Sequence, residues 1–144
     1  MFVVTIINQI TKTYEREYPE MSEIIKVTSV DPKEIAALAI EFKKKLRTLE
    51  KELNNYLLKY GFEVSYHYEL NTVRISDRDK EKIYKLTKQK PILLFPVIRI
   101  KPKREICEAY VLRDGTVVLK YTTIEGSKIK ENYYVLTRRG FQKI

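Results

Sequence analysis

The segment EICEAYVLRDGTVVLKYTTI, residues 105–124, decides the fold, because two apolar, strand-forming stretches flank Asp114-Gly115. An Asp-Gly pair favours a two-residue type I′ hairpin turn, since both positions tolerate positive φ. Such a turn pairs Leu112 with Val117 and Tyr110 with Leu119. The resulting apolar face consists of Ile106, Tyr110, Leu112, Val117, Leu119 and Tyr121. We predict an antiparallel hairpin whose other face, including Lys120, meets solvent or a ligand.

The sequence on both sides of this hairpin continues the β pattern. Glu125-Gly126-Ser127 predicts a second turn, and residues 133–136 predict a last strand. Before the hairpin, ILLFPVIRI at 92–100 predicts a buried strand with a bulge or edge at Pro96, which cannot donate to a ladder. The C-terminal third is therefore predicted to be an antiparallel meander.

Three more strands are predicted nearer the N-terminus. FVVTII at 2–7 is apolar without alternation, which indicates a strand covered on both faces. EIIKVTSV at 23–30 is a second candidate. FEVSYHYEL at 62–70 alternates apolar and polar residues, which is typical of a half-buried strand.

A long amphipathic helix is predicted from Pro32 to Tyr60. Asp31 suits the N-cap, Pro32 suits the first helical position, and Gly61 suits the left-handed residue that ends a helix. A heptad seam runs through Ile35, Ala39, Phe42, Leu46, Leu49, Leu53, Tyr56 and Tyr60. The seam can lie on the protein's own sheet or meet a second copy. Such a helix is about 43 Å long, which exceeds the width of a small domain, so part of the seam should extend beyond the sheet. We therefore predict a homodimer through 32–60.

A short second helix is predicted at 77–88, because Ser76 and Asp79 have the spacing of a capping box. The fold class is α+β: a mixed or antiparallel sheet, one long helix, one short helix and a C-terminal meander. No linker or repeat interrupts the chain, so a single domain over 1–144 is expected.

Composition limits the environment. One cysteine, Cys107, excludes an intramolecular disulfide, and no apolar run reaches the ~18 residues that span a bilayer. We expect a cytoplasmic, reducing location without membrane insertion. Abundant Lys, Glu and Ile with scarce His, Cys and Met are typical of hyperthermophiles, so the expected source is such an archaeon or its virus.

The net charge of +9 is concentrated in one stretch. Residues 72–104 hold 11 Lys and Arg against 3 Asp and Glu, whereas residues 1–71 hold 10 against 11. A field of this sign favours a polyanion such as nucleic acid, although a Lys-rich solubilising surface explains it equally. The candidate phosphate contacts are Arg74, Arg78, Lys82, Lys85, Arg99, Lys101, Lys103 and Arg104.

The C-terminal residues 133–144, YYVLTRRGFQKI, resemble the last wing strand of archaeal winged-helix DNA-binding proteins. Strands are predicted where that family has its helix-turn-helix, so the family's function is not carried over. Arg138 and Arg139 are kept as further candidate phosphate contacts.

Catalytic signatures are sparse. Four glycines form no phosphate-binding loop, and one histidine with one cysteine excludes the usual zinc arrangements. Glu63, His67 and Glu69 share one face of a predicted strand and are the candidates for catalysis. Residues two apart on a strand lie nearly 7 Å apart, so a solvated polar face is the simpler explanation. We expect no metal and no cofactor.

These patterns lead to three hypotheses. The first is a non-enzymatic nucleic-acid-binding protein that contacts the phosphate backbone through a basic surface. The second is a metal-dependent nuclease or related phosphodiester enzyme that uses Glu63, Glu69 and perhaps Glu105 or Glu108 with His67. The third is a virus-encoded inhibitor that binds a host nucleic-acid machine.

Overall fold

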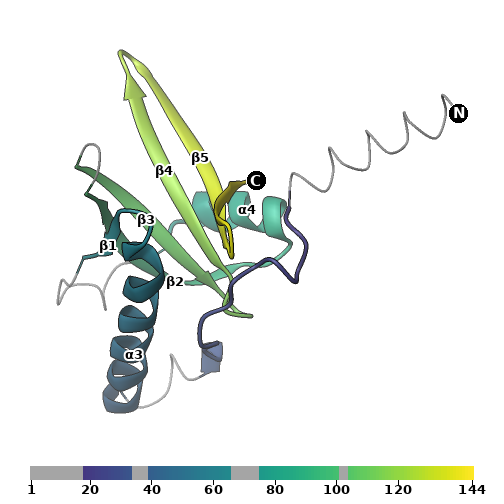
Figure 1. Ribbon diagram of the computed structural model, residues 1–144. Coiled ribbons are helices and arrows are strands. Elements are labelled where there is room, and N and C mark those ends of the chain that lie inside the picture. The colour runs from purple at the N-terminus through teal and green to yellow at the C-terminus, as the bar shows by residue number, and fades with distance from the viewer. Residues whose placement is uncertain (1–17, 34–38, 66–74, 101–103) are drawn as a thin grey trace, which may run out of the picture.

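The computed structural model describes residues 18–33, 39–65, 75–100 and 104–144, and the following account is confined to them. They form one antiparallel sheet whose strands lie side by side in chain order, together with two helices (Figure 1). The helices are α3 (Ala39–Leu58) and α4 (Asp77–Thr87). The strands are β1 (Phe62–Val64), β2 (Pro91–Arg99), β3 (Glu105–Leu112), β4 (Val117–Glu125), β5 (Lys128–Thr137) and β6 (Gly140–Lys143). The α+β class and the C-terminal meander are confirmed.

The sheet is curled, so that its two edge strands approach each other. Phe62 of β1 and Phe141 of β6 have ring centroids 5.3 Å apart at an interplanar angle of 73°, and Tyr60 meets Phe141 at 5.8 Å. Such edge-to-face contacts are favourable for aromatic rings. The face on which these rings lie is therefore concave.

The concave face carries the larger core. Four leucines of α3 are at most 8% exposed and pack against this face: Leu46, Leu49, Leu53 and Leu57. From the sheet the core takes Phe62, Val64, Phe95, Val97, Cys107, Ala109, Val111, Val117, Leu119 and Leu136. The leucines recur every three or four residues, which puts them on one side of the helix.

The convex face carries the second core, over which α4 lies. Ile83 of α4 is fully buried there. Its partners are Ile24, Tyr110, Leu112, Val118, Tyr133 and Val135. The two helices therefore cover opposite faces of the sheet.

The helix predicted over 32–60 is not confirmed at that length. The structure describes a helical turn at 32–33 and then α3, and residues 34–38 lie outside the described residues. Over the described part, the leucines of the seam are covered by the chain's own sheet. The predicted dimer contact through this seam therefore has no support in the described residues. None of the described helices has the length and apolarity to cross a membrane.

The start of α4 agrees with the prediction. The Ser76 hydroxyl accepts a hydrogen bond from the Asp79 amide at 3.2 Å, as the capping-box spacing indicated. At the other end, Lys88 takes a left-handed conformation with φ 62°, and its amide donates to the Tyr84 carbonyl at 2.7 Å.

The predicted register of the β3–β4 hairpin is wrong by one residue. Val111 pairs with Val117 and Tyr110 with Val118, because the loop has three residues rather than two. The Gly115 amide donates to the Leu112 carbonyl at 2.9 Å, and Gly115 itself has φ +92°. A tight turn followed by a positive-φ glycine is the usual three-residue hairpin loop.

A one-residue slip reverses which side chains share a face. Ile106, Tyr110 and Leu112 lie on the convex face, whereas Leu119 and Tyr121 lie on the concave face. The single apolar face predicted for this hairpin is therefore divided between the two faces of the sheet.

The N-terminal strand predictions have mixed outcomes. Residues 2–7 lie outside the described residues. Residues 23–30 form no strand and make only isolated bridges, from Ile24 to Thr137 and from Lys26 to Thr116. Within the segment predicted at 62–70, β1 covers three residues, and 66–70 lie outside the described part.

Candidate nucleic-acid interface

The charged side chains that are exposed on α3 between 43 and 58 are all basic. Because residues three and four apart share a helix face, burial of the leucine seam turns Lys44, Arg47 and Lys51 outward. We define the basic helix face as Lys43, Lys44, Lys45, Arg47 and Lys51, all of which are exposed. Lys44, Arg47 and Lys51 form no ion pair with any residue that the structure describes. Lys59, just after the helix, is also exposed.

Two acidic residues of α3, Glu50 and Glu52, are not exposed. Glu50 is 9% exposed, and burial raises the pKa of its carboxyl, although the nearby Arg47 guanidinium opposes the rise. The Glu52 carboxylate accepts hydrogen bonds from the Thr28 amide at 3.1 Å and from the Thr28 hydroxyl at 2.7 Å. Between 43 and 60 no exposed side chain is acidic.

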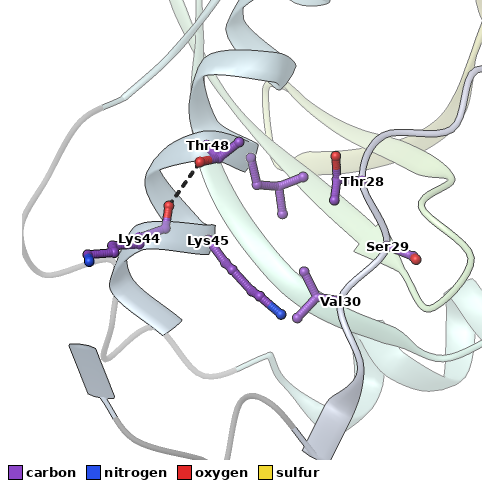
Figure 2. A pocket seen from close by; sticks show the side chains of 7 residues that line it. Thr28, Ser29, Val30, Lys44, Lys45 and Thr48 are labelled. Atoms are coloured by element: carbon purple, nitrogen blue, oxygen red, sulfur yellow. Dashed lines mark hydrogen bonds between the residues drawn. The ribbon is translucent and has the colours of Figure 1, made fainter. Parts of the chain in front are cut away.

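A pocket of about 200 Å³ borders the basic helix face (Figure 2). It is lined by Thr28, Ser29, Val30, Lys44, Lys45, Thr48 and Leu49. Lys45 reaches toward Val30 across the pocket, while Lys44 points away from it. The pocket thus combines hydroxyl and ammonium groups, which are common donors to phosphate oxygens.

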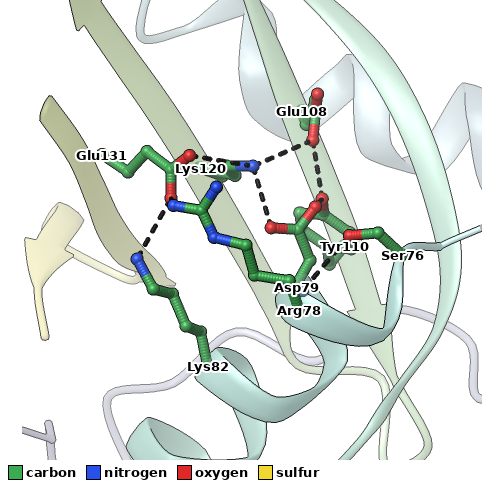
Figure 3. Close-up of polar contacts among 8 residues, drawn as sticks. All are labelled: Ser76, Arg78, Asp79, Lys82, Glu108, Tyr110, Lys120 and Glu131. Carbon is green, nitrogen blue, oxygen red and sulfur yellow. Dashed lines mark hydrogen bonds and ion pairs between the residues drawn. The ribbon is translucent and has the colours of Figure 1, made fainter. Parts of the chain in front are cut away.

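A second polar cluster joins α4 to the convex face, and its centre is the Lys120 ammonium (Figure 3). This group lies 2.9 Å from Asp79, 3.7 Å from Glu131 and 3.8 Å from Glu108. The Tyr110 hydroxyl contacts Asp79 at 2.9 Å and Glu108 at 2.6 Å. Arg78 and Lys82 also bind Glu131. The cluster therefore contains three carboxylates and three cations.

The pKa values of this cluster follow from its contacts. Burial alone raises the pKa of Asp79, but hydrogen bonds from Lys120, Tyr110 and Ser76 outweigh it and leave the pKa below its ordinary value. Burial alone lowers the pKa of Lys120, and the surrounding carboxylates reverse this and raise it. Burial and the neighbouring carboxylates raise the pKa of the Tyr110 phenol. Asp79 and Lys120 are therefore held in their charged forms at neutral pH.

Two of the three basic residues that the sequence predicted on α4 as phosphate contacts form ion pairs within this cluster. The Arg78 and Lys82 side chains lie 3.3 and 3.2 Å from the Glu131 carboxylate. Lys85, in the last turn, is exposed. These three residues lie over the convex face, opposite to α3.

The other described candidates lie elsewhere. Arg99 lies on the concave side and donates a hydrogen bond to the Tyr121 hydroxyl at 3.0 Å. Its guanidinium lies 5.9 Å from the centre of the Phe62 ring and 3.9 Å from the Glu105 carboxylate. Arg104, before β3, and Arg138 and Arg139, between β5 and β6, are exposed, and Arg139 lies 3.8 Å from Glu23. The described members of the predicted set therefore do not share one surface.

The remaining predicted residues are placed only in part. Five of them lie outside the described residues: Arg74, Lys101, Lys103, His67 and Glu69. Glu63 is exposed on β1. Over the described ranges, no group of three or more His, Cys, Asp or Glu side chains is placed to hold a metal ion.

Sequence analysis missed the basic helix face because charge was counted along the chain. Residues 1–71 have nearly balanced charges, and this balance hides the exposed cations between 43 and 51. Projecting the predicted helix at 100° per residue would have shown that Lys44, Arg47 and Lys51 lie opposite the seam.

No protein-family model, curated protein or solved structure matches this chain.

Proposed function

We propose that the protein is a non-enzymatic nucleic-acid-binding protein that contacts the phosphate backbone through the basic helix face of α3. The observation that carries the proposal is the absence of any exposed acid among the five exposed cations between 43 and 51. A rigid helix holds these cations at fixed spacing, and Lys and Arg at such spacing bind phosphates without reading base sequence.

A solubilising lysine surface differs from a binding surface in how its charges are arranged. Around Lys120 the cations alternate with carboxylates, which neutralises that part of the convex face. On α3, Glu50 is buried and Glu52 is held by Thr28, so no exposed acid lies among the cations between 43 and 51. The net charge of +9 strengthens association with any polyanion.

The test compares two triple variants with equal net charge. One carries Lys44→Ala, Arg47→Ala and Lys51→Ala on α3. The other carries Lys80→Ala, Lys85→Ala and Lys90→Ala on and after α4. Binding to duplex and single-stranded DNA and to RNA is titrated against salt in the presence of a chelator, which suppresses metal-dependent cleavage.

For duplex DNA, loss of three phosphate contacts should reduce the slope of log affinity against log salt by about 2 to 3. We expect this reduction in the α3 variant only. Equal losses in both variants would mean that total charge, not this face, governs binding. No binding of the wild type at low salt, or loss confined to the α4 variant, would also overturn the proposal.

A further inference from the structure

Asp114-Gly115 is a chemically reactive pair as well as a turn. It is the only place in the sequence where Asp or Asn precedes Gly. The backbone nitrogen that follows an aspartic acid can attack its γ-carbon, and glycine, which has no side chain, leaves this attack unobstructed. The new nitrogen–carbon bond forms as water leaves, made from the carboxyl OH and the amide hydrogen. A second water then opens the succinimide ring at either carbonyl, which gives aspartate or isoaspartate.

Three donors hold the carboxylate of Asp114. Its Oδ1 accepts a hydrogen bond from the Thr116 amide at 3.0 Å, and its Oδ2 accepts one from the Gln89 side-chain amide at 3.0 Å. The Lys26 ammonium lies 3.4 Å from Oδ2. The donors belong to three different parts of the chain: the N-terminal segment, the residues after α4 and the start of β4. Rotation of the Asp114 side chain therefore breaks contacts with segments that the fold keeps in place.

The same donors oppose cyclisation through the charge of Asp114. Cyclisation consumes the protonated acid, because the oxygen leaves as water. Burial raises the pKa of Asp114, but hydrogen bonds from Gln89 and Thr116 and the charge of Lys26 outweigh burial and leave the pKa below its ordinary value. The phenol of Tyr18 also faces this carboxylate, and burial and the negative charge together raise the Tyr18 pKa. The reactive, protonated form of Asp114 is therefore scarce at neutral pH.

The attacking nitrogen and the product are restrained as well. The Gly115 amide donates to the Leu112 carbonyl at 2.9 Å, and this hydrogen bond holds the proton that the nitrogen must lose. Isoaspartate would add one carbon to the main chain just before Gly115. The Gly115 carbonyl accepts from the Val27 amide at 2.9 Å, and the Val27 carbonyl oxygen would lie only 2.1 Å from a Cβ added to Gly115. The folded turn therefore has no room for a longer main chain.

We propose that Asp114-Gly115 is a latent isoaspartate site, which the contacts of both residues keep unmodified while the chain is folded. Opening of the turn frees the carboxylate and the amide together, so the modification marks chains that have opened between β3 and β4. Because these strands pair through this turn, isoaspartate at 114 prevents return to the native register. The proposal does not depend on nucleic-acid binding.

The rate of isoaspartate formation tests the proposal. The full chain is incubated at mildly acidic pH and at a temperature below that of unfolding, and isoaspartate at 114 is measured by mass spectrometry of the digested chain. The folded wild type is compared with the wild type in guanidinium chloride. We expect isoaspartate to accumulate about tenfold more slowly in the folded chain, because the turn must open before the nitrogen attacks.

Two variants, Gln89→Leu and Lys26→Met, each remove one donor. Under folding conditions both should form isoaspartate about threefold faster than the wild type, because the carboxylate loses a contact that keeps it ionised. Lys85→Met makes the same change of charge at an exposed site of α4 and should leave the rate unchanged. Phe141→Ala removes ring contacts at β6 instead of contacts of Asp114. At an equal loss of stability, it should accelerate the reaction less than Gln89→Leu does.

Lys26→Met decides the matter if Gln89→Leu does not fold, since the Lys26 side chain is 35% exposed and its loss leaves no buried gap. Three results overturn the proposal. The first is the absence of isoaspartate at 114 even in guanidinium chloride. The second is an equal rate in the folded and the unfolded wild type. The third is a rate in the folded donor variants that matches Lys85→Met or follows the unfolded fraction alone, which would show that these contacts give no protection of their own.

Discussion

Gly115 is the residue at which the turn between β3 and β4 meets the N-terminal segment. The Val27 amide donates to the Gly115 carbonyl at 2.9 Å. A Cβ at position 115 would lie 2.1 Å from the Val27 carbonyl oxygen, and the φ of +92° is strained for any other residue. Both backbone conformation and backbone contact therefore require glycine here.

Gly115→Ala should lower the free energy of unfolding by at least about 3 kcal/mol, because the clash adds to the strain of positive φ. Gly126→Ala is the matched control, since Gly126 has φ +61° but no atom within 4 Å of an added Cβ. That variant should lose about 1 kcal/mol. Urea denaturation measures both, and losses of equal size would show that the Val27 contact contributes nothing.

Lys120 and Asp79 make the stability depend on pH at both ends of the scale. The lowered pKa of Asp79 contributes stability that is present above the unfolded-state value of about 4 and is lost as pH falls through the lower folded-state value. The raised pKa of Lys120 contributes stability that is present below about pH 10.4 and is lost as pH rises through the higher folded-state value.

Lys120→Met should cost about 3 kcal/mol at pH 7, because it leaves Asp79, Glu108 and Glu131 without their shared ammonium. The difference from wild type should shrink at pH 3, where protonation removes the repulsion among the carboxylates. Lys85→Met, with the same change of charge at an exposed site, should stay within about 0.5 kcal/mol. Chemical denaturation at several pH values checks this, and a pH-independent difference would contradict it.

The same turn shows where residue-level sequence reasoning reaches its limit. Asp114-Gly115 identified the hairpin but not the length of its loop, because glycine supplies positive φ in both two-residue and three-residue loops. The contact of Gly115 with Val27, 88 residues away in the sequence, was not visible in the local pattern. The wrong register then reversed the predicted faces of one strand relative to the other.

At the scale of elements, predictions succeeded where a local rule suffices. The start of α4 followed from Ser76 and Asp79, whose hydrogen bond depends only on residues three apart. The strand predicted at 23–30 failed because a strand needs a continuous neighbour. Its residues form only two isolated bridges, from Ile24 to Thr137 and from Lys26 to Thr116, and these do not join into a continuous ladder.

The basic helix face and the leucine seam are two sides of one element. Burial of Leu49 and Leu53 at 1% and 0% exposure determines which way α3 is turned. The outward position of Lys44 and Lys51 is then a consequence of helix geometry. A second copy was predicted to cover the seam, whereas its described leucines pack on the chain's own sheet. An apolar heptad fits a sheet and a second helix equally well, so the sequence did not distinguish them.

At the scale of the whole molecule, closure of the curled sheet could not be predicted from the sequence. It joins Phe62, at one edge, to Phe141, at the other, through strands that are far apart along the chain. Tyr60 adds a second ring contact. The meander itself was predicted, since each of its turns is local, but the curvature depends on packing around α3 across the whole concave face.

Phe141→Ala should release the β6 edge without unfolding the sheet. Removing this partly buried ring abolishes its contacts with Tyr60 and Phe62, and we expect a loss of about 2 kcal/mol. β6 pairs only with β5 among the described strands, whereas β3 and β4 have neighbours on both sides. In the Phe141→Ala variant, the protection of the β6 amides from exchange should therefore fall more than that of the β3 and β4 amides. Hydrogen exchange at residue resolution measures this difference. If protection in β6 falls no more than protection in β3 and β4, the edges are held together by α3 and the backbone, and the aromatic contacts are incidental.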